Sequence, residues 1–412
     1  MIFKKVDVIF FVEHKDRELD SIKHIADKLK KMFNYKSVIL SVNFHLHYLF
    51  LYRPKLVVSF YISSVNHHPI PIIKMLYPDV KYLSMNWEQL LSPINLEFKK
   101  PRDKFTKEII YHIAWDKNYF NYLVENNVKI ENVNVTGNIS LLLLKQTIDK
   151  EKERYYDELD KKYSLSKYKR IIFFPMNLAW AFFNEKDLSS RVQLGYDINT
   201  LNEHHELAKM YLKKLLNWVS LSSHILNDYL FVIRPHPYIT EDDYIEAFKS
   251  FNLNINKNVV ISKEYTIKEW LAVSDKIYSN WSTVVYDANL MGLDSSLLSP
   301  FPRPKWLNVN WNDQVLNIKD YKKFIEDLKR NNIKESNNSC EDFYKIDENI
   351  AIYIDTILNS SNSNKNNKIE IDFKLLIKVF IKNTLKSLSS KYFNYYKINK
   401  RERMDYFDVI KY

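Results

Sequence analysis

Short apolar runs alternate with amphipathic helical stretches along most of this chain, and this alternation constrains its fold more than any other feature. Between the first two runs, Ile22, Ile25 and Leu29 recur at helical spacing. Strands that alternate with helices form βαβ units, so the pattern predicts an α/β fold with a parallel sheet. The strand-like runs of the first half are Val8–Val12, Ser37–Val42, Lys55–Tyr61, Val80–Met85, Tyr111–Trp115 and Val133–Thr136.

The alternation restarts after a highly charged boundary, residues 149–169, which is expected to be a helix and linker. Strands are expected at Arg170–Pro175, Tyr229–Ile233, Val259–Ile261 and Lys276–Ser279, and helices at Glu203–Leu226, Asp242–Phe251, Thr266–Val273 and Thr283–Met291. We therefore expect two Rossmann-like domains, residues 1–150 and 165–340, with no visible sequence repeat between them.

Residues 341–412 are expected to form a helical extension and a basic tail. A Ser/Asn-rich linker, Asn359–Asn367, precedes apolar residues at helical spacing and four lysines that recur every fourth residue: Lys374, Lys378, Lys382 and Lys386. Residues 365–412 carry twelve Lys/Arg and five Asp/Glu, hence +7 of the chain's net +11. This composition is typical of an interfacial helix, so docking on an anionic membrane is expected, and packing against the N-terminal half is the alternative.

Composition excludes several classes of protein. The chain has only 3 glycines in 412 residues, none near another, which excludes P-loop and ordinary dinucleotide-binding loops. A single cysteine, Cys340, permits no intrachain disulfide and suits a reducing cytoplasm. No apolar run reaches the roughly 18 residues of a spanning helix, so a cytoplasmic protein, soluble or peripheral on the inner membrane, is expected.

Two polar segments follow predicted strands of the second half, where open α/β sheets bind ligands. The first is Arg234-Pro235-His236-Pro237, which offers a guanidinium and an imidazole to a phosphate. The second is Ser279–Asp287, in which Ser282 or Thr283 can cap a helix whose N-terminus attracts anions. Each segment alone also fits an ordinary turn or cap, but the pair points to a nucleotide phosphate. Asn177 follows the first strand of this half and is a further candidate.

The first half offers carboxylates for acid–base chemistry. Glu88 follows the strand Val80–Met85 and is the first candidate for a general base or nucleophile. Glu13 and His14 follow the first strand and are the other catalytic candidates, while Asp16 and Arg17 are expected to contact the acceptor. A solvated surface carboxylate and an acidic first helical turn are the plain alternatives.

The order and spacing of these segments resemble bacterial GT-B glycosyltransferases of surface carbohydrate synthesis over roughly residues 6–310. The His-Pro and Ser/Thr motifs resemble those of transferases that use CMP-activated Kdo or sialic acids, and of teichoic-acid polymerases that use CDP-glycerol. The resemblance implies that His236, Ser279, Ser282 and Thr283 hold the donor phosphate and that Asp287 is the acidic residue of the following helix. It also implies a cleft between two α/β halves. Here the segment reads Ser-Asn-Trp-Ser, without the family's adjacent serines.

The function expected from these observations is transfer of a sugar, Kdo or another nonulosonic acid, from a CMP-linked donor to a glycan or lipid-linked glycan in capsule or lipopolysaccharide synthesis. Neither a metal nor another cofactor is expected, because no Asp-x-Asp motif occurs and the histidine pairs lack metal-site spacing. A CDP-glycerol-type polyol-phosphate transferase is the alternative within the class. A nucleic-acid-binding or non-catalytic assembly protein is the alternative outside it, but the net basic charge is concentrated in the tail and no nucleic-acid recognition motif occurs.

Overall fold

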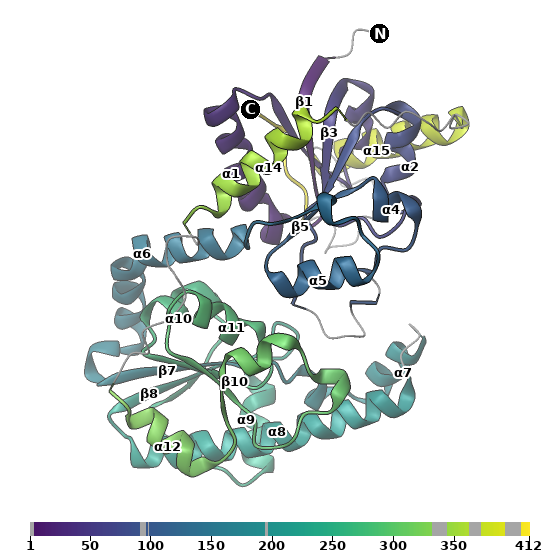
Figure 1. Ribbon diagram of the computed structural model, residues 1–412. Coiled ribbons are helices and arrows are strands. Elements are labelled where there is room, and N and C mark those ends of the chain that lie inside the picture. Colours follow the sequence, from purple (N-terminus) through teal and green to yellow (C-terminus); the bar gives the residue numbers. More distant parts are fainter. Residues whose placement is uncertain are drawn as a thin grey trace. The chain divides into compact units, whose positions relative to one another are not determined.

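The computed structural model describes residues 4–90, 96–97, 99–193, 197–331, 344–361, 372–391 and 405–412. The chain divides into two compact units. Unit 1 comprises Met1–Leu143 and Cys340–Tyr412, and unit 2 comprises Leu144–Ser339. Each unit has its own sheet, parallel or nearly so, with helices packed on it (Figure 1), which confirms the expected α/β architecture.

The sheet of unit 1 has seven strands among the described residues, in the order β13-β2-β1-β3-β4-β5-β6. Only β13 runs antiparallel to its neighbour, and the other pairs are parallel. The strands are β1 (Lys4–Val12), β2 (Ser37–Ser41), β3 (Tyr52–Ser59), β4 (Lys81–Ser84), β5 (Tyr111–Ala114), β6 (Val133–Val135) and β13 (Ile410–Lys411). Because β2 lies on one side of β1 and β3 on the other, the direction of winding reverses between β1 and β3. The carboxyl ends of these two strands form the switch point at which such sheets bind ligands.

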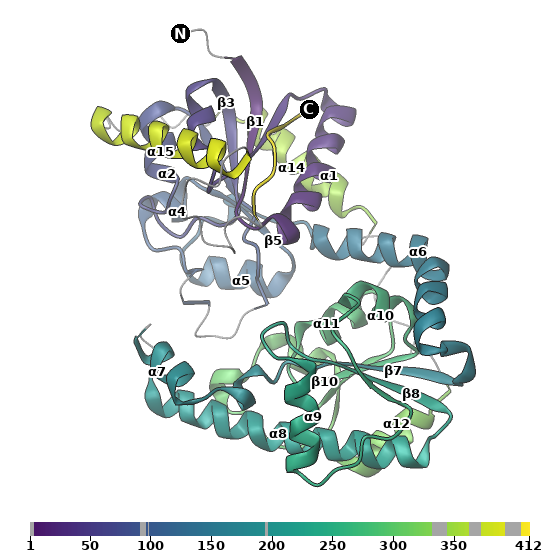
Figure 2. The ribbon, with the colours of Figure 1, turned by 180° about the vertical axis from the view of Figure 1, so that it is seen from behind.

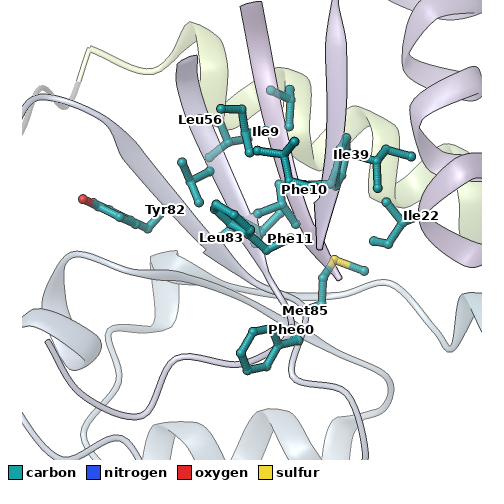
Figure 3. Close-up of a cluster of buried hydrophobic side chains, with 14 of the residues drawn as sticks. Ile9, Phe10, Phe11, Ile22, Ile39, Leu56, Phe60, Tyr82, Leu83 and Met85 are labelled. Carbon is teal, nitrogen blue, oxygen red and sulfur yellow. The ribbon is translucent and has the colours of Figure 1, made fainter. Parts of the chain in front are cut away.

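The core of unit 1 explains why its strands read as continuous apolar runs. Figure 3 shows Phe10 and Phe11 of β1 among Ile39, Leu56 and Leu83 from neighbouring strands, and all five are at most 1% exposed. Successive side chains of a strand point to opposite faces, so both faces of this sheet must be covered by helices.

One helix of unit 1, α14 (Ile346–Asn359), belongs to the C-terminal part of the chain, and its first residue lies close to Gly137. Gly137 follows β6 with φ +93°, and a Cβ there would lie 2.6 Å from Ile346, so both the backbone and the packing require glycine. The helices are α1 (Lys15–Phe33), α2 (Ile70–Leu76), α4 (Lys104–Glu108), α5 (Lys117–Glu125), α14 (Ile346–Asn359) and α15 (Phe373–Lys391), with 3-10 turns η1 (Leu46–Phe50) and η2 (Ile130–Asn132).

The C-terminal extension belongs to unit 1, where α14 and α15 both pack (Figure 2). Helix α14 lies against α1, and His24 of α1 is 2.9 Å from the Asp347 carboxylate. Helix α15 contacts η1, and its Phe380 packs edge-on against Phe50 at 5.2 Å between ring centres. The last residues then return to the sheet, where β13 pairs with β2.

The sheet of unit 2 has six strands among the described residues, all parallel, in the order β12-β11-β10-β7-β8-β9. Numbered within the unit this is 6-5-4-1-2-3, the doubly wound order whose switch point lies between β7 and β10. The strands are β7 (Arg170–Pro175), β8 (Tyr229–Arg234), β9 (Val259–Ile261), β10 (Lys276–Ser279), β11 (Ser295–Leu298) and β12 (Leu316–Ile318).

The helices of unit 2 begin with α6 (Ile139–Tyr163), which starts in unit 1 and occupies most of the charged boundary that the sequence indicated. The others are α7 (Glu185–Gln193), α8 (Ile198–Ile225), α9 (Glu241–Ser250), α10 (Ile267–Val273), α11 (Thr283–Leu290) and α12 (Tyr321–Lys329), with 3-10 turns η3 (Leu165–Lys167), η4 (Ala179–Phe182), η5 (Lys305–Leu307) and η6 (Asn310–Gln314). In the described ranges, every helix is too short or too polar to cross a bilayer. Cys340 and most of the Ser/Asn-rich linker lie outside the described residues.

Candidate functional site

At the switch point of unit 2, two asparagines join the loops that follow β7 and β10. The Asn177 backbone N–H donates to Oδ1 of Asn280 at 3.1 Å, and Nδ2 of Asn280 donates back to the Asn177 carbonyl at 3.0 Å. The Asn280 side chain is buried, so this reciprocal pair is shielded from water. Asn177 thus contributes to this contact through its backbone N–H and carbonyl. Asn280 contributes through its side chain, and the sequence analysis did not identify it as a functional candidate.

The helix that follows β10 begins at this same edge. Ser282 is the N-cap of α11, and its Oγ accepts the Val284 N–H at 3.4 Å. Thr283 is the first residue of the helix. The first amides of α11 therefore point towards the carboxyl edge of the sheet, where an anion can accept from them.

Ser279 differs from Ser282 in where its hydroxyl points. It is fully buried, donates to the Pro175 carbonyl and lies 3.2 Å from Oδ1 of Asn280. These contacts tie the end of β10 to β7. Its contact with a donor phosphate stays a prediction.

At the end of β8, Arg234 and His236 lie in a loop held by side-chain contacts. Nη1 of Arg234 donates to the Tyr265 carbonyl beyond β9. Nδ1 of His236 lies 3.4 Å from the Tyr238 backbone N–H, which can donate to it, so the ring proton belongs on Nε2. Burial lowers the pKa of His236, and the nearby Lys263 charge lowers it further. His236 is thus a neutral imidazole with an Nε2–H donor.

Lys263 is a functional candidate that the sequence analysis missed. Its ammonium donates to the carbonyls of Pro237 and Ile239 at 2.8 and 2.9 Å, and so fixes the loop that carries His236. The available signal was its position two residues after the strand Val259–Ile261, at a strand end like His236 after β8. Strands β8 and β10 both flank β7, so their ends are separated by about 10 Å along the sheet.

Asp287 lies one turn into α11 and is half-buried. Among the described residues, its carboxylate has neither a hydrogen-bond donor nor a cation paired with it. Burial raises the pKa of Asp287 to about 7, so the group exchanges a proton near neutral pH.

At the switch point of unit 1, a buried carboxylate organises the turn that follows β1. Glu18 is fully buried, accepts the Glu13 N–H at 2.8 Å and accepts Nη2 of Arg17 at 2.7 Å. Burial raises the pKa of Glu18, although the hydrogen bond from Arg17 opposes this shift. Glu18 therefore positions Glu13 and Arg17 at the edge of the sheet.

Glu88, after β4, is joined to the same cluster by two cations. One carboxylate oxygen accepts from Arg17, and the other accepts from Nζ of Lys99 at 2.7 Å. Burial raises the pKa of Glu88, but the hydrogen bond and charge of Lys99 and the charge of Arg17 outweigh it, so the pKa lies below its usual 4.5. Its φ of +64° is left-handed backbone that costs a non-glycine residue energy, as is common at functional sites.

His14 lies beside this cluster and contacts the far end of the chain. Its Nδ1 is 3.4 Å from Oδ2 of Asp405, and its Nε2 is 4.0 Å from the Glu13 carboxylate. Asp16 is exposed in the first turn of α1, where the helix dipole favours an acid. The structure thus brings Glu13, His14, Arg17 and Glu88 into one cluster of unit 1.

In the parts of the chain that the structure describes, no three His, Cys, Asp or Glu side chains gather as they would around a metal ion. The histidines that occur in pairs serve local contacts instead. His45 accepts the Ser41 N–H at 3.0 Å, and Nδ1 of His205 lies 2.6 Å from the Trp180 carbonyl. Metal-independent chemistry stays a prediction.

No family model matches this sequence, and no curated protein matches it significantly. Among solved structures, a proposed UDP-N-acetylglucosamine 2-epimerase from Listeria monocytogenes is similar, with a TM-score of 0.57 and 11% identity over 89% of this chain and 100% of that protein. The UDP-GlcNAc 2-epimerase of Neisseria meningitidis, solved with UDP-GlcNAc bound, matches with a TM-score of 0.51 and 13% identity over 93% of this chain and 100% of that one. The wall teichoic acid polymerase TagF matches at a TM-score of 0.44 and 12% identity over 94% of this chain and 91% of that one.

The chain has a GT-B-like fold. At 11 and 13% identity the two epimerase matches support the fold alone, and the weaker TagF match supports no further inference. The expected fold class is therefore confirmed, while the specific glycosyltransferase family named from the motifs stays a prediction. The two epimerases are named for a nucleotide sugar, but likeness of fold does not assign their reaction to this chain.

Proposed function

We propose that the protein is a glycosyltransferase that binds a nucleotide-activated sugar through unit 2. The observation that carries this proposal is a set of groups suited to bind an anion along one edge of the unit 2 sheet. They are Arg234 at the end of β8, His236 just after it, and the N-terminus of α11 at Ser282 after β10. Guanidinium, imidazole N–H and free helix amides are the donors that phosphates accept.

In this proposal the phosphate of the donor is the leaving group. Negative charge develops on its oxygens as the glycosidic bond breaks, and fixed donors stabilise that charge without a change in their own positions. His236 suits this role because its Nε2 carries a proton while Nδ1 faces the Tyr238 amide. Lys263 contributes by holding the loop that carries His236.

We assign activation of the acceptor hydroxyl to unit 1. Glu88 is a weak base as it stands, because its two oxygens accept from Arg17 and Lys99 and its pKa is low. His14 is the better base, since Nδ1 faces a carboxylate and Nε2 can then accept a proton. Glu88 would instead fix Arg17 and Lys99, and Glu13 and Asp16 remain candidates for contacts with the acceptor.

Nucleotide binding is the direct test of the donor site. In a thermal-shift screen of CMP, CDP, UDP, GDP and their sugars, at least one nucleotide should raise the melting temperature of the wild type. His236→Ala should lose that shift while its own melting temperature changes little. Ser282→Ala should reduce the shift, and loss of the cap of α11 should also lower its own stability by about 1 kcal/mol. His224→Ala, an exposed histidine in the last turn of α8, is the matched control and should retain the shift.

Product analysis then separates the reactions. Incubation of the donor that binds with candidate glycan acceptors should release the nucleotide and lengthen the glycan. Conversion of the nucleotide sugar to an epimer without acceptor would identify an epimerase instead, and transfer from CDP-glycerol would identify a polyol-phosphate transferase. If none of these nucleotides binds, the proposal fails.

The finer expectations from sequence are kept as part of this proposal. They are a CMP-linked Kdo or related nonulosonic acid as the donor, a surface glycan as the acceptor, and a cytoplasmic location. Their support is the motif resemblance alone, so the screen includes CMP-sugars first.

We also propose that α15 attaches the enzyme to an anionic membrane. The helix packs on unit 1 through Leu376 and Asn383, which are buried, but a stripe of its apolar residues faces solvent. Phe373, Ile377, Ile381 and Leu388 are between 45 and 68% exposed. The exposed lysines Lys374, Lys378 and Lys382 flank that stripe and complement anionic lipid, and each is worth about 1 kcal/mol near such a surface.

A further inference from the structure

The C-terminal segment, residues 405–412, reaches the catalytic cluster of unit 1, and we call this segment the strap. Its strand β13 pairs with β2, where the Tyr412 N–H donates to the Ser37 carbonyl at 2.9 Å. Phe407 is buried in the core of unit 1. The ring of Tyr406 packs edge-on against Phe44 at 5.4 Å between centres. These contacts fix the strap on unit 1 immediately after Asp405.

Asp405 begins the strap and meets the first turn of α1. One carboxylate oxygen accepts the Lys15 backbone N–H at 2.9 Å, and the other lies 3.4 Å from Nδ1 of His14. The N-cap residue of α1 is His14, which makes no side-chain capping bond. Asp405 therefore supplies the acceptor that a helix N-terminus needs, from 390 residues away in the sequence.

We propose that Asp405 is a positioning residue that holds His14 in the tautomer competent for proton abstraction, an inference that rests on the proposed glycosyl transfer. A carboxylate only accepts hydrogen bonds, so its contact with Nδ1 requires the ring proton to be on Nδ1. Nε2 lies 4.0 Å from the Glu13 carboxylate, too far for a hydrogen bond, so its lone pair is then free. This atom takes the proton of the acceptor hydroxyl as that oxygen bonds to the sugar carbon and the donor phosphate leaves.

Asp405→Asn tests the tautomer. The amide oxygen of Asn can still accept from Lys15 while its NH₂ group faces Nδ1, so the ring proton should move to Nε2. Nitrogen NMR of the neutral imidazole, assigned with His14→Gln, should report protonated Nδ1 in the wild type and protonated Nε2 in Asp405→Asn. Asp408→Asn is the matched control on the same strap, because Asp408 pairs with Lys391, and it should leave the His14 signal unchanged.

Kinetics supply the second readout. Asp405→Asn should lower kcat about 100-fold or more, as loss of a general base does, while the KM for the donor stays within about twofold. A wild-type tautomer in Asp405→Asn, or unchanged turnover, would overturn the inference. If the wild type transfers no sugar from any donor but the tautomer changes as described, the proposed function fails and the positioning of His14 by Asp405 stands.

Discussion

At the scale of single residues, the carboxyl groups of the two sites differ chiefly in what surrounds them. Glu88 accepts hydrogen bonds from two cations, and its pKa falls below the usual value. Asp287 is half-buried and has no such partner among the residues that the structure describes, and burial raises its pKa to about 7. At neutral pH a carboxyl group is therefore ionised at Glu88 in unit 1, but gains and loses its proton at Asp287 in unit 2.

Asp287→Asn should increase stability at alkaline pH. The folded-state pKa of Asp287 is raised from 3.8 to about 7, so the folded state holds this proton more tightly than the unfolded state does. The resulting stabilisation of the folded state is complete below about pH 4 and is lost as the pH rises through 7. At pH 8 the variant should exceed the wild type by about 2–4 kcal/mol in the free energy of unfolding. Urea denaturation at pH 4.5 and pH 8 measures this, with the exposed Asp157→Asn on α6 as control. An equal difference at both pH values would contradict the titration of Asp287.

Glu88→Gln and His14→Gln together distinguish positioning from base catalysis. His14→Gln removes the proposed base and should lower kcat by about 100-fold or more. Glu88→Gln keeps an oxygen acceptor for one cation and should lower kcat only by about tenfold, since it weakens a charge-assisted contact. Steady-state kinetics at saturating donor measure both. The reverse order of effects would restore Glu88 as the base.

At the scale of elements, a lysine of the sheet holds a helix from the C-terminal part of the chain. Nζ of Lys81, at the start of β4, donates to the carbonyls of Ile357, Leu358 and Ser360 at 2.7, 3.2 and 2.6 Å. These groups lie at the end of α14, where helix carbonyls lack internal partners. Lys81 therefore fixes the end of α14 on unit 1.

Lys81→Met should remove the hydrogen bonds to the end of α14 and keep the apolar part of the side chain at residue 81. Loss of hydrogen bonds from a charged donor should lower the free energy of unfolding by about 2 kcal/mol. Denaturant unfolding measures the total, and hydrogen exchange should show faster exchange in α14 than in α1. Lys55→Met removes an ammonium that is mostly exposed and should change stability by less than about 1 kcal/mol. Equal effects of the two substitutions would argue against the role of Lys81.

The exposed stripe of α15 gives a second prediction at this scale. The wild type should sediment with vesicles rich in phosphatidylglycerol at low salt. Ile377→Asp combined with Ile381→Asp should weaken that binding about tenfold or more, because two exposed apolar side chains lose their burial in lipid. Ile225→Asp at the exposed end of α8 is the control and should bind as the wild type does. If the wild type stays in the supernatant, α15 only packs against unit 1 and the proposed membrane attachment is wrong.

At the scale of the whole molecule, each unit has its own sheet and its own hydrophobic core. The residues of the proposed donor site belong to unit 2, and those of the proposed catalytic cluster belong to unit 1, as does the C-terminal extension. A ligand that binds one unit should therefore slow hydrogen exchange mainly in that unit.

A bound nucleotide should slow hydrogen exchange chiefly in unit 2. At a concentration of 100 Kd it should stabilise the native state by about 2.7 kcal/mol, and the greatest protection should fall on the loop at His236 and on the first turn of α11. Hydrogen exchange with mass spectrometry measures this region by region. His236→Ala should remove the protection, and protection confined to unit 1 would show that the nucleotide binds elsewhere.

The sequence by itself determined the fold class. Short continuous apolar runs such as Val8–Val12 are typical of strands covered on both faces, and their alternation with helices predicts parallel sheets. The segments that follow strands, Glu13–Arg17 and Arg234–Pro237, were recognisable because they combine polar groups with a strand end. Short edge strands such as Leu316–Ile318 were missed, because three residues carry too little periodicity.

Only the tertiary structure decided which side chains meet and in what state. The contact of Asp405 with His14, the pairing of Glu88 with Lys99 and the inward hydroxyl of Ser279 depend on residues brought together by folding. Periodicity is a local property, since it reflects the geometry of one helix or strand. Hydrogen bonds and pKa values depend on burial and on neighbours from distant segments, so they are fixed only when the sheets and their covering helices are assembled.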